Sequence, residues 1–395
     1  MIVDPFRLDL ARDRRILTLS GPIVIGMLSQ TVQNLVDTAM VGRLNATSLA
    51  AVGMGATATW LSVSLLLGIG SATQALVARR IGEGRPAEAG AVLDNALVLG
   101  GLAGVVVAAA VYLVAPGIFS ILTNDAQVQG LGSGYLRMRT LGFPFVVLNF
   151  AFRGFYHGVG DTRTYLKAIL ITNLLNVVLD ALLIFGLLGF PRMEAEGAGL
   201  ATSLGLMGGT LYYLLVAGPS TGIRARYGGL CFRRICKELC RKVISIMLPN
   251  GMQSMGNALG ILAFYWMMGR ISTLAVAVTN LMVNISSVFF LPALGMGLAA
   301  ATLVGQALGR GEPDDAEAWG WETVRVSVYA FTAAGLVLAF FPEITLRLFT
   351  NDAEVIAEGT LALRVTALGQ FAVAATMVLS NILISAGQAR YVALA

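Results

Sequence analysis

Two acidic residues lie inside long apolar segments of this sequence, where a charged carboxylate is energetically costly. Asp37 lies near the end of the apolar run 16–41, and Asp180 lies near the end of the run 164–186. Ionisable residues in such segments are usually functional. Two carboxylates that lie close together titrate as a coupled pair, so the pair can bind and release a proton. The same oxygens could instead bind Na⁺, because hard cations prefer oxygen ligands.

Two uncharged polar residues are expected at the same level as these acids. Asn176 lies one helical turn from Asp180 on the same helix face. Thr202 lies about five residues into the apolar run 197–218, and at 1.5 Å per residue it falls roughly 6–9 Å below the same membrane surface as Asp37 and Asp180. The sequence therefore predicts a cation-coupling site of two carboxylates, an amide and a hydroxyl, with H⁺ or Na⁺ as the ion. The alternative is that these side chains only join neighbouring helices by hydrogen bonds.

The composition indicates a polytopic membrane protein. Of 395 residues, 56% are hydrophobic and 12% are charged, whereas about 25% are charged in a soluble globular protein. Ten apolar runs are long enough to cross a bilayer, and an eleventh begins near Tyr391. The ten are 16–41, 48–78, 90–117, 131–153, 164–186, 197–218, 243–269, 274–304, 318–341 and 358–385. The formal charge of +5 does not indicate a nucleic-acid partner in such a protein.

Lys and Arg residues concentrate on one side of the predicted membrane. The N-terminal tail and the even-numbered connections hold 18 of the 27 Lys and Arg residues, and the odd-numbered connections hold four. Connections rich in Lys and Arg stay in the cytoplasm. We therefore expect a multi-pass protein of the inner (cytoplasmic) membrane with a cytoplasmic N-terminus.

The chain also contains two copies of one pattern, offset by 227 residues without a gap. Residues 68–86 (GIGSATQALVARRIGEGRP) match residues 295–313 (GMGLAAATLVGQALGRGEP) at eight of nineteen positions, and 122–128 (LTNDAQV) matches 349–355 (FTNDAEV). The matches include Gly, Pro, Asn and Asp residues of the connections, which chance similarity between apolar helices does not explain. The offset predicts an internal repeat.

The repeat predicts two parallel six-helix units in two lobes around a central cavity. The N-lobe would be 1–218 with helices one to six, the basic cytoplasmic linker 219–242, and the C-lobe 243–395 with helices seven to ten and the start of helix eleven. Because the last residue matches position 168, the equivalent of 169–218 is absent. We therefore expect the last one to two helices to be missing from the sequence.

Four segments carry a resemblance to a known family. They are P-x14-D-T-A-M-V-G (22–42), RGFYHGVGDTR (153–163), NLLNVVLDALLIFG (173–186) and EGAGLAT (196–202). In order and spacing they resemble the multidrug and toxic compound extrusion (MATE) transporters. The resemblance implies a twelve-helix, two-lobed antiporter that exports lipophilic or cationic compounds in exchange for H⁺ or Na⁺. It also implies that Asp37, Asn176, Asp180 and Thr202 form the cation site of the N-lobe.

The second half of the chain departs from some branches of that family. Position 264, which matches Asp37, is Phe, and predicted helices seven, eight and ten have no acidic residue in their interiors. The chain is therefore most similar to the DNA-damage-inducible (DinF-like) branch, with coupling confined to the N-lobe.

Further residues are candidates for substrate contact and for movement. Gln33, Met252, Gln253 and Asn257 are polar or adaptable side chains expected to line the substrate cavity. Pro22 could act as a hinge because it removes one backbone hydrogen bond. Its repeat mate Pro249 leaves open that both prolines are fixed kinks.

The expected function is secondary antiport of a small molecule by a monomer without a cofactor. The alternative is a lipid-linked oligosaccharide flippase of the same wider superfamily, which would need a basic cavity for a pyrophosphate. A major-facilitator transporter is disfavoured because ARRIGEGRP lacks an Asp beside its Gly and Arg residues. The sequence has no H-E-x-x-H or G-x-S-x-G motif that would indicate an enzyme. A truncated chain could also be a scaffold that does not transport.

Overall fold

The structure is a computed structural model of the 395-residue chain, and it describes residues 9–218, 222–232, 235–347 and 353–394. Helix is the only regular secondary structure in those residues, which confirms the all-α prediction. The elements are α1 (Leu10–Gly42), α2 (Ala46–Gly82), α3 (Pro86–Leu122), α4 (Ala126–Thr140), α5 (Phe143–Val159), α6 (Thr162–Phe185), η1 (Leu187–Gly189), α7 (Glu194–Val216), α8 (Ile223–Tyr227), α9 (Lys237–Gly269), α10 (Thr273–Arg310), α11 (Pro313–Phe340), α12 (Pro342–Arg347), α13 (Ala353–Leu368), α14 (Gln370–Ser385) and α15 (Ala389–Leu394).

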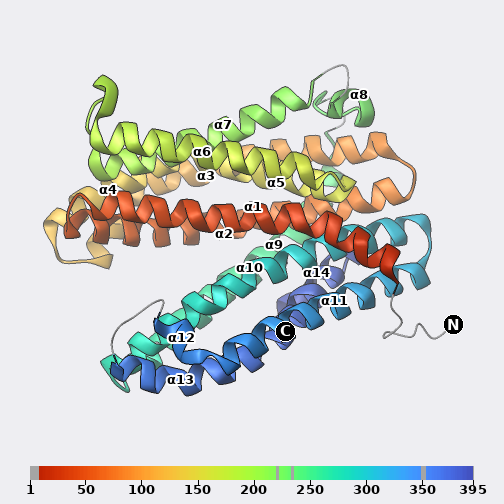
Figure 1. Ribbon diagram of the computed structural model, residues 1–395. Coiled ribbons are helices and arrows are strands. Elements are labelled where there is room, and N and C mark those ends of the chain that lie inside the picture. The colour runs from red at the N-terminus through yellow and green to blue at the C-terminus, as the bar shows by residue number, and fades with distance from the viewer. Residues whose placement is uncertain (1–8, 219–221, 233–234, 348–352, 395) are drawn as a thin grey trace.

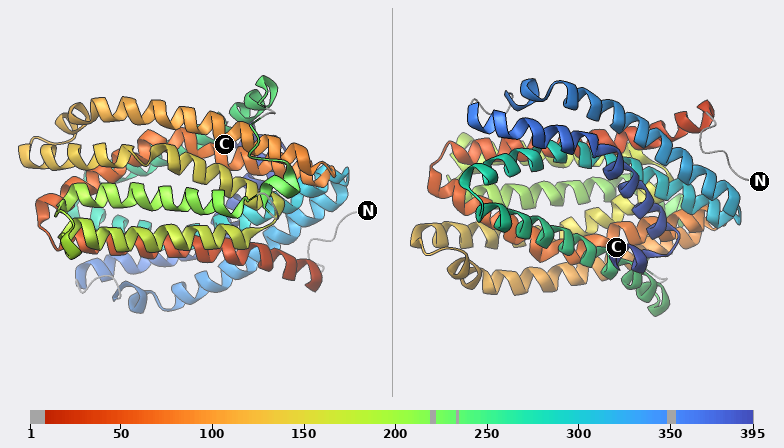
Figure 2. Two further views of the ribbon diagram at one scale, coloured as in Figure 1. Left: turned by 90° about the horizontal axis from the view of Figure 1, so that it is seen from above. Right: turned by 90° about the horizontal axis from the view of Figure 1, so that it is seen from below.

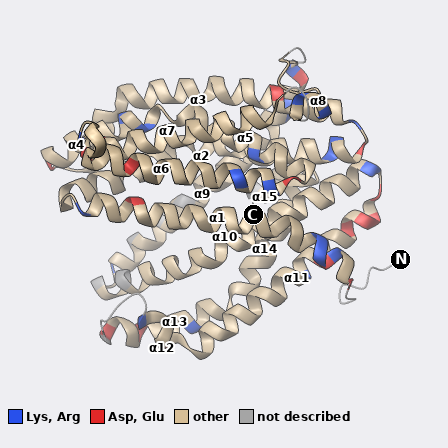
Figure 3. Ribbon diagram, turned by 45° about the horizontal axis from the view of Figure 1, so that its top comes forward, with Lys and Arg blue, Asp and Glu red and all other residues tan. Residues whose placement is uncertain are grey.

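Many of these helices are long and apolar enough to cross a membrane. In the described residues seven meet that test, namely α1, α2, α3, α6, α7, α11 and most of α10. The pair α13–α14 is an eighth candidate, and the other two predicted runs correspond to α9 and to the pair α4–α5. Charged side chains gather mostly at the ends of the helices (Figure 3), as expected for a protein whose middle lies in lipid.

Capping residues determine where several helices begin. Side chains of Asp9, Asn45, Asp125, Asp161 and Ser272 accept hydrogen bonds from backbone N–H groups in the first turn. Two of these capping residues lie in segments named above: Asp125 in the repeated segment 122–128, and Asp161 in the motif 153–163. The repeat mates at 349–352 lie outside the described residues.

Two predicted spans are each divided into two helices. The run 131–153 becomes α4 and α5, which part near Gly142, and the run 358–385 becomes α13 and α14, which part at Gly369. The two glycines are 227 positions apart, so the break recurs at the same place in both repeats. At the first break Pro144 lies in the first turn of α5, where its missing N–H costs no hydrogen bond. At the second break the axes differ by 42°.

The helices form two groups that meet at one end. Helices α1–α7, which we call the first bundle, lie side by side, and α9–α14, the second bundle, form the other group (Figure 1). The bundles meet near the N-terminus and diverge toward the end that carries α4, α12 and α13. The views from above and below show the long helices of both bundles running along roughly one axis (Figure 2).

Glycine makes the contact between the bundles possible. A Cβ on Gly82 of α2 would lie 2.1 Å from the backbone oxygen of Gln306 in α10, and a Cβ on Gly309 would lie 2.2 Å from that of Arg79. Gly82 and Gly309 are repeat mates, 227 positions apart. Their backbones therefore touch where the two bundles meet, and a side chain has no room there.

Replacing Gly82 by alanine is expected to destabilise this junction by about 1–3 kcal/mol, since the added methyl group must push backbone apart. The measurement is the thermal unfolding midpoint of the purified protein in detergent. Gly53→Ala on the same helix is the matched control, because nothing lies within 4 Å of a Cβ at that position. Equal midpoints for the two variants would contradict the close contact.

Candidate functional site

Helices α1, α6 and α7 pack against one another and carry the residues predicted to bind a cation. Asp37 lies near the end of α1, Asn176 and Asp180 lie on α6, and Thr202 lies on α7. Asp180 is 0% exposed and Asn176 is 2% exposed, while Asp37 and Thr202 are half-buried. The structure brings these four side chains together in the first bundle, and we call the cluster the acid site.

Helical spacing explains how the chain builds this site. Asn176 and Asp180 are four residues apart on the buried face of α6, and Gln33 and Asp37 have the same spacing on α1. Helix α7 approaches closely because a Cβ on Gly205 would lie only 3.1 Å from the Cβ of Asn176. The polar faces of α1 and α6 therefore lie against each other, beside α7, inside an otherwise apolar bundle.

Amide groups connect the two carboxylates. Nε2 of Gln33 donates hydrogen bonds to Asp37 and, over 2.5 Å, to Oδ1 of Asn176. With the Asn176 amide turned over, its Nδ2 lies 3.0 Å from Oδ1 of Asp37 and 3.1 Å from Oδ2 of Asp180, and its Oδ1 lies 3.3 Å from the hydroxyl of Thr202. The two orientations differ in whether Asn176 donates to the acids.

The two acids are close enough to interact directly. The carboxyl groups of Asp37 and Asp180 lie within hydrogen-bonding reach of each other. Oδ1 of Asp180 is buried and has no hydrogen-bond partner among the described residues. Two carboxylates in contact repel each other when both are ionised, and a bound cation relieves that repulsion. The pair can therefore hold a proton or a metal ion.

The structure adds a positive charge that was not assigned to this site from the sequence. Arg139 of α4 interacts electrostatically with both Asp37 and Asp180, and it hydrogen bonds with Tyr135. Nε of Arg139 is buried without a hydrogen-bond partner among the described residues. The sequence did indicate that Arg139 has a role, because a charged residue within the apolar run 131–153 is costly.

Packing holds α4 beside the acids. Tyr135 is 5% exposed and packs in one cluster with Val41 and Ile184, which lie one turn beyond Asp37 and Asp180 respectively. From α7, the hydroxyl of Ser203 donates to the backbone oxygen of Met138 over 2.8 Å. Both contacts fix the turn of α4 that carries Arg139.

A metal ion in this site would need amide or hydroxyl ligands besides the two acids. Across 9–218, 222–232, 235–347 and 353–394, no group of three or more His, Cys, Asp or Glu residues is arranged to hold a metal. The remaining oxygens would come from Asn176 and Thr202.

The residues expected to line a substrate cavity do not lie together. Gln33 is 5% exposed and belongs to the acid site. Met252 and Asn257 are exposed and Gln253 is half-buried, all on α9 of the second bundle. Pro22 lies within α1, which remains one helix from Leu10 to Gly42. Substrate contact and hinge movement stay predictions for these residues.

A comparison with protein families decides the identity of the fold. The family model MatE matches residues 22–182 and 249–395, two segments whose starts are 227 positions apart. The chain belongs to the MatE family. This MATE chain is therefore a membrane transporter and not an enzyme.

Individual relatives are similar over most of this MATE chain. The multidrug resistance protein PmpM of Pseudomonas aeruginosa is 29% identical over 360 residues, 91% of this chain and 75% of PmpM. An FAD transporter of Shewanella oneidensis is 26% identical over 349 residues, 87% of this chain and 75% of that protein. A solved structure of a multidrug resistance MATE transporter in an outward-facing conformation superposes with a TM-score of 0.87 at 23% identity, covering 97% of this chain and 84% of the other.

Proposed function

We propose that this protein is a secondary antiporter that exports lipophilic cations in exchange for a cation bound at the acid site. The observation that carries the proposal is the contact between two carboxylates, Asp37 and Asp180, inside a lipid-spanning bundle. Such a pair must gain or lose a cation to change its charge, and that change can be linked to a movement of the helices. No cofactor is needed for this cycle, and a monomer contains the whole site.

The direction of transport follows from the proposed topology. With a cytoplasmic N-terminus in the inner membrane, the bundles meet at the cytoplasmic face and diverge toward the outside (Figure 1). In this proposal residues 1–218 and 243–395 move as two units joined by 219–242. A cation enters the acid site from outside, α1 repacks against α6, and the bound compound leaves outward.

The coupling ion in this proposal is H⁺. Arg139 supplies one fixed positive charge against the two carboxylates, which leaves one negative charge for a single proton to cancel. Na⁺ would bring a second full charge close to the guanidinium group without removing either carboxylate charge. One proton shared by the two carboxyl groups cancels the remaining negative charge, and burial of the pair then costs less free energy.

The test is transport by the purified full chain in lipid vesicles. A fluorescent lipophilic cation is placed inside, and its movement is followed after imposing either a pH gradient or a Na⁺ gradient. We expect the pH gradient to drive movement at least several-fold above protein-free vesicles and the Na⁺ gradient to have no effect. Movement driven by Na⁺ alone would contradict H⁺ coupling, and no movement under either gradient would contradict the antiport proposal.

Export of an anionic compound is the second candidate function. It is supported by the relative named FAD transporter. The lipid-linked oligosaccharide flippase considered from the sequence would also carry a pyrophosphate anion. The two candidates make opposite demands on charge, because a buried acid pair favours a cation while a pyrophosphate favours basic side chains. Unlabelled FAD added inside the same vesicles should leave dye movement unchanged if the substrate is a cation.

A further inference from the structure

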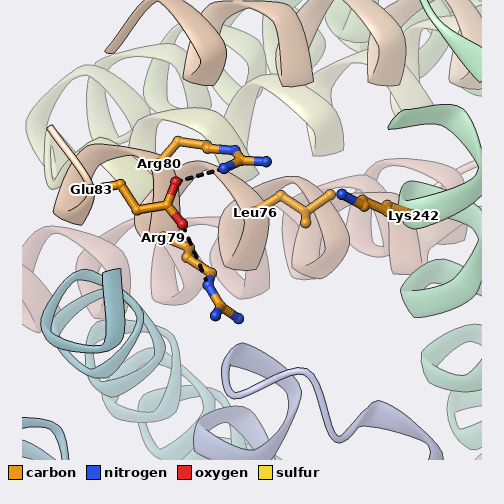
Figure 4. Close-up of a pocket in the computed structure, with 5 residues that line it drawn as sticks. All are labelled: Leu76, Arg79, Arg80, Glu83 and Lys242. Atoms are coloured by element: carbon orange, nitrogen blue, oxygen red, sulfur yellow. Dashed lines mark hydrogen bonds and ion pairs between the residues drawn. The ribbon is translucent and has the colours of Figure 1, made fainter. Parts of the chain in front are cut away.

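A cavity of about 300 Å³ lies where the two bundles meet, and it shares no residue with the acid site. It is lined by Leu76, Arg79, Arg80 and Glu83 of α2 and by Lys242 of α9 (Figure 4). We call it the junction pocket. It draws its lining from the first bundle and from the first turns of the second bundle.

The charge of the junction pocket is positive. Three of the lining side chains are basic and one is acidic. Glu83 pairs with Arg80 over 2.5 Å and with Arg79 over 3.6 Å, and Arg80 also pairs with Glu88 over 3.2 Å. Lys242 forms no ion pair with any residue that the structure describes. Its ammonium group and the outer guanidinium of Arg79, whose side chain is 56% exposed, are available to an added anion.

The surroundings of the pocket combine charge with apolar surface. Leu76 is the apolar residue of its lining, and Val243 and Met247 of α9, near Lys242 in the chain, are buried against the first bundle. A lipid-spanning helix that ends in arginine places this combination at the boundary between hydrocarbon and water. Basic pockets between helices at such a boundary bind phosphate-containing lipid headgroups.

We propose that the junction pocket binds the phosphate group of an anionic phospholipid. Guanidinium groups match phosphate geometry with paired N–H donors, and the lysine adds a point charge from the other bundle. The acyl chains would lie along the apolar faces of α2 and α9. Free inorganic phosphate shares the headgroup chemistry and is the competing source of the ligand.

A lipid bound there would hold the two bundles together. Helices α2 and α9 already pack tightly next to the pocket, since a Cβ on Gly68 would lie 2.2 Å from the backbone oxygen of Met247. A phosphate bridging Arg79 and Lys242 adds attraction across the same contact. The bound lipid would therefore favour the arrangement in which the bundles meet at this end and diverge at the other.

The test measures binding of a fluorescently labelled phosphatidylglycerol to the purified full chain in detergent. Lys242→Gln and Arg79→Gln are expected to weaken binding roughly fivefold each, as expected for loss of one basic residue near an anionic headgroup. The matched control is Arg241→Gln, because Arg241 is the exposed neighbour of Lys242 and does not line the pocket. Unlabelled phosphatidylglycerol should displace the probe, and unlabelled phosphatidylcholine should not.

Two results would overturn the proposal. Equal weakening by Lys242→Gln and Arg241→Gln would show attraction to a basic surface and not to the pocket. Displacement of the probe by millimolar inorganic phosphate as effective as that by phosphatidylglycerol would show that the ligand is free phosphate. The thermal unfolding midpoints of all variants are compared before binding is measured. If Lys242→Gln is unstable, the binding of Arg79→Gln tests the pocket instead. The assay involves no transport, so its outcome is independent of the proposed antiport.

Discussion

Replacing Asp37 by asparagine is expected to reduce export of a lipophilic cation to the background of cells without the transporter. Asparagine has nearly the shape of aspartate and can still hydrogen bond with Gln33, but it cannot bind a proton or carry a charge. The acid site would then keep only one carboxylate, Asp180, so no carboxyl pair would remain to share a cation. Cation binding could then no longer drive the cycle.

The measurement is efflux of a fluorescent lipophilic cation from cells that lack other pumps, at matched membrane expression. Asp180→Asn is expected to fail in the same way because it removes the other half of the pair. Asp314→Asn is the control, since Asp314 is exposed at the start of α11 and far along the chain from the acid site. Export by Asp37→Asn at the wild-type rate would mean that this carboxylate only joins helices.

The grouping of the acid site could be predicted because it depends on local spacing and on depth. Asn176 and Asp180 share a helix face whatever the rest of the fold does. Their level with Asp37 and Thr202 follows from the same count, whereas their contact also requires that α1, α6 and α7 pack side by side, as the family resemblance implies. Depth below a surface can be counted along each helix, so the sequence contains that information.

The rest of the site depends on which helices are neighbours. Arg139 joins the acids because α4 packs against α7, and nothing in the sequence near Arg139 states that contact. Gln33 hydrogen bonds with Asn176, a contact that depends on how α1 is rotated against α6, and its expected contact with substrate stays a prediction. The breaks at Gly142 and Gly369 were missed for a similar reason, because the apolar pattern continues through both glycines.

A second large effect is expected at the opposite end of the molecule, where ion pairs join the bundles. Arg325 of α11 donates to Asp13 of α1 over 2.7 Å, and Arg12 of α1 donates to Asp315 of α11 over 2.8 Å. The Arg325 side chain is only 4% exposed, against 28% for Arg12. A buried pair is screened little by water and salt, so the Arg325–Asp13 pair is the stronger of the two links.

Reversing the charge of Arg325 is expected to separate the bundles at this end. Removing one partner of a buried ion pair costs about 3–5 kcal/mol, and Arg325→Glu adds repulsion from Asp13. Arg12→Gln should have a smaller effect, because the Arg12–Asp315 pair is more exposed to water than the Arg325–Asp13 pair. Exchanging the partners in the double variant Asp13→Arg with Arg325→Asp should restore most of the contact.

Spin labels can report this separation. One label is attached at Arg85→Cys in the connection between α2 and α3, and the other at Asp314→Cys, both exposed, after Cys231, Cys236 and Cys240 are replaced by serine. In the doubly labelled protein that keeps Arg325, the distribution of distances between the two labels should have one short component. Arg325→Glu should add a longer component that the charge exchange removes. A distribution unchanged by Arg325→Glu would mean that the close backbone contacts between the bundles, such as Gly82 with Gln306 and Gly68 with Met247, hold this end together without help from charge.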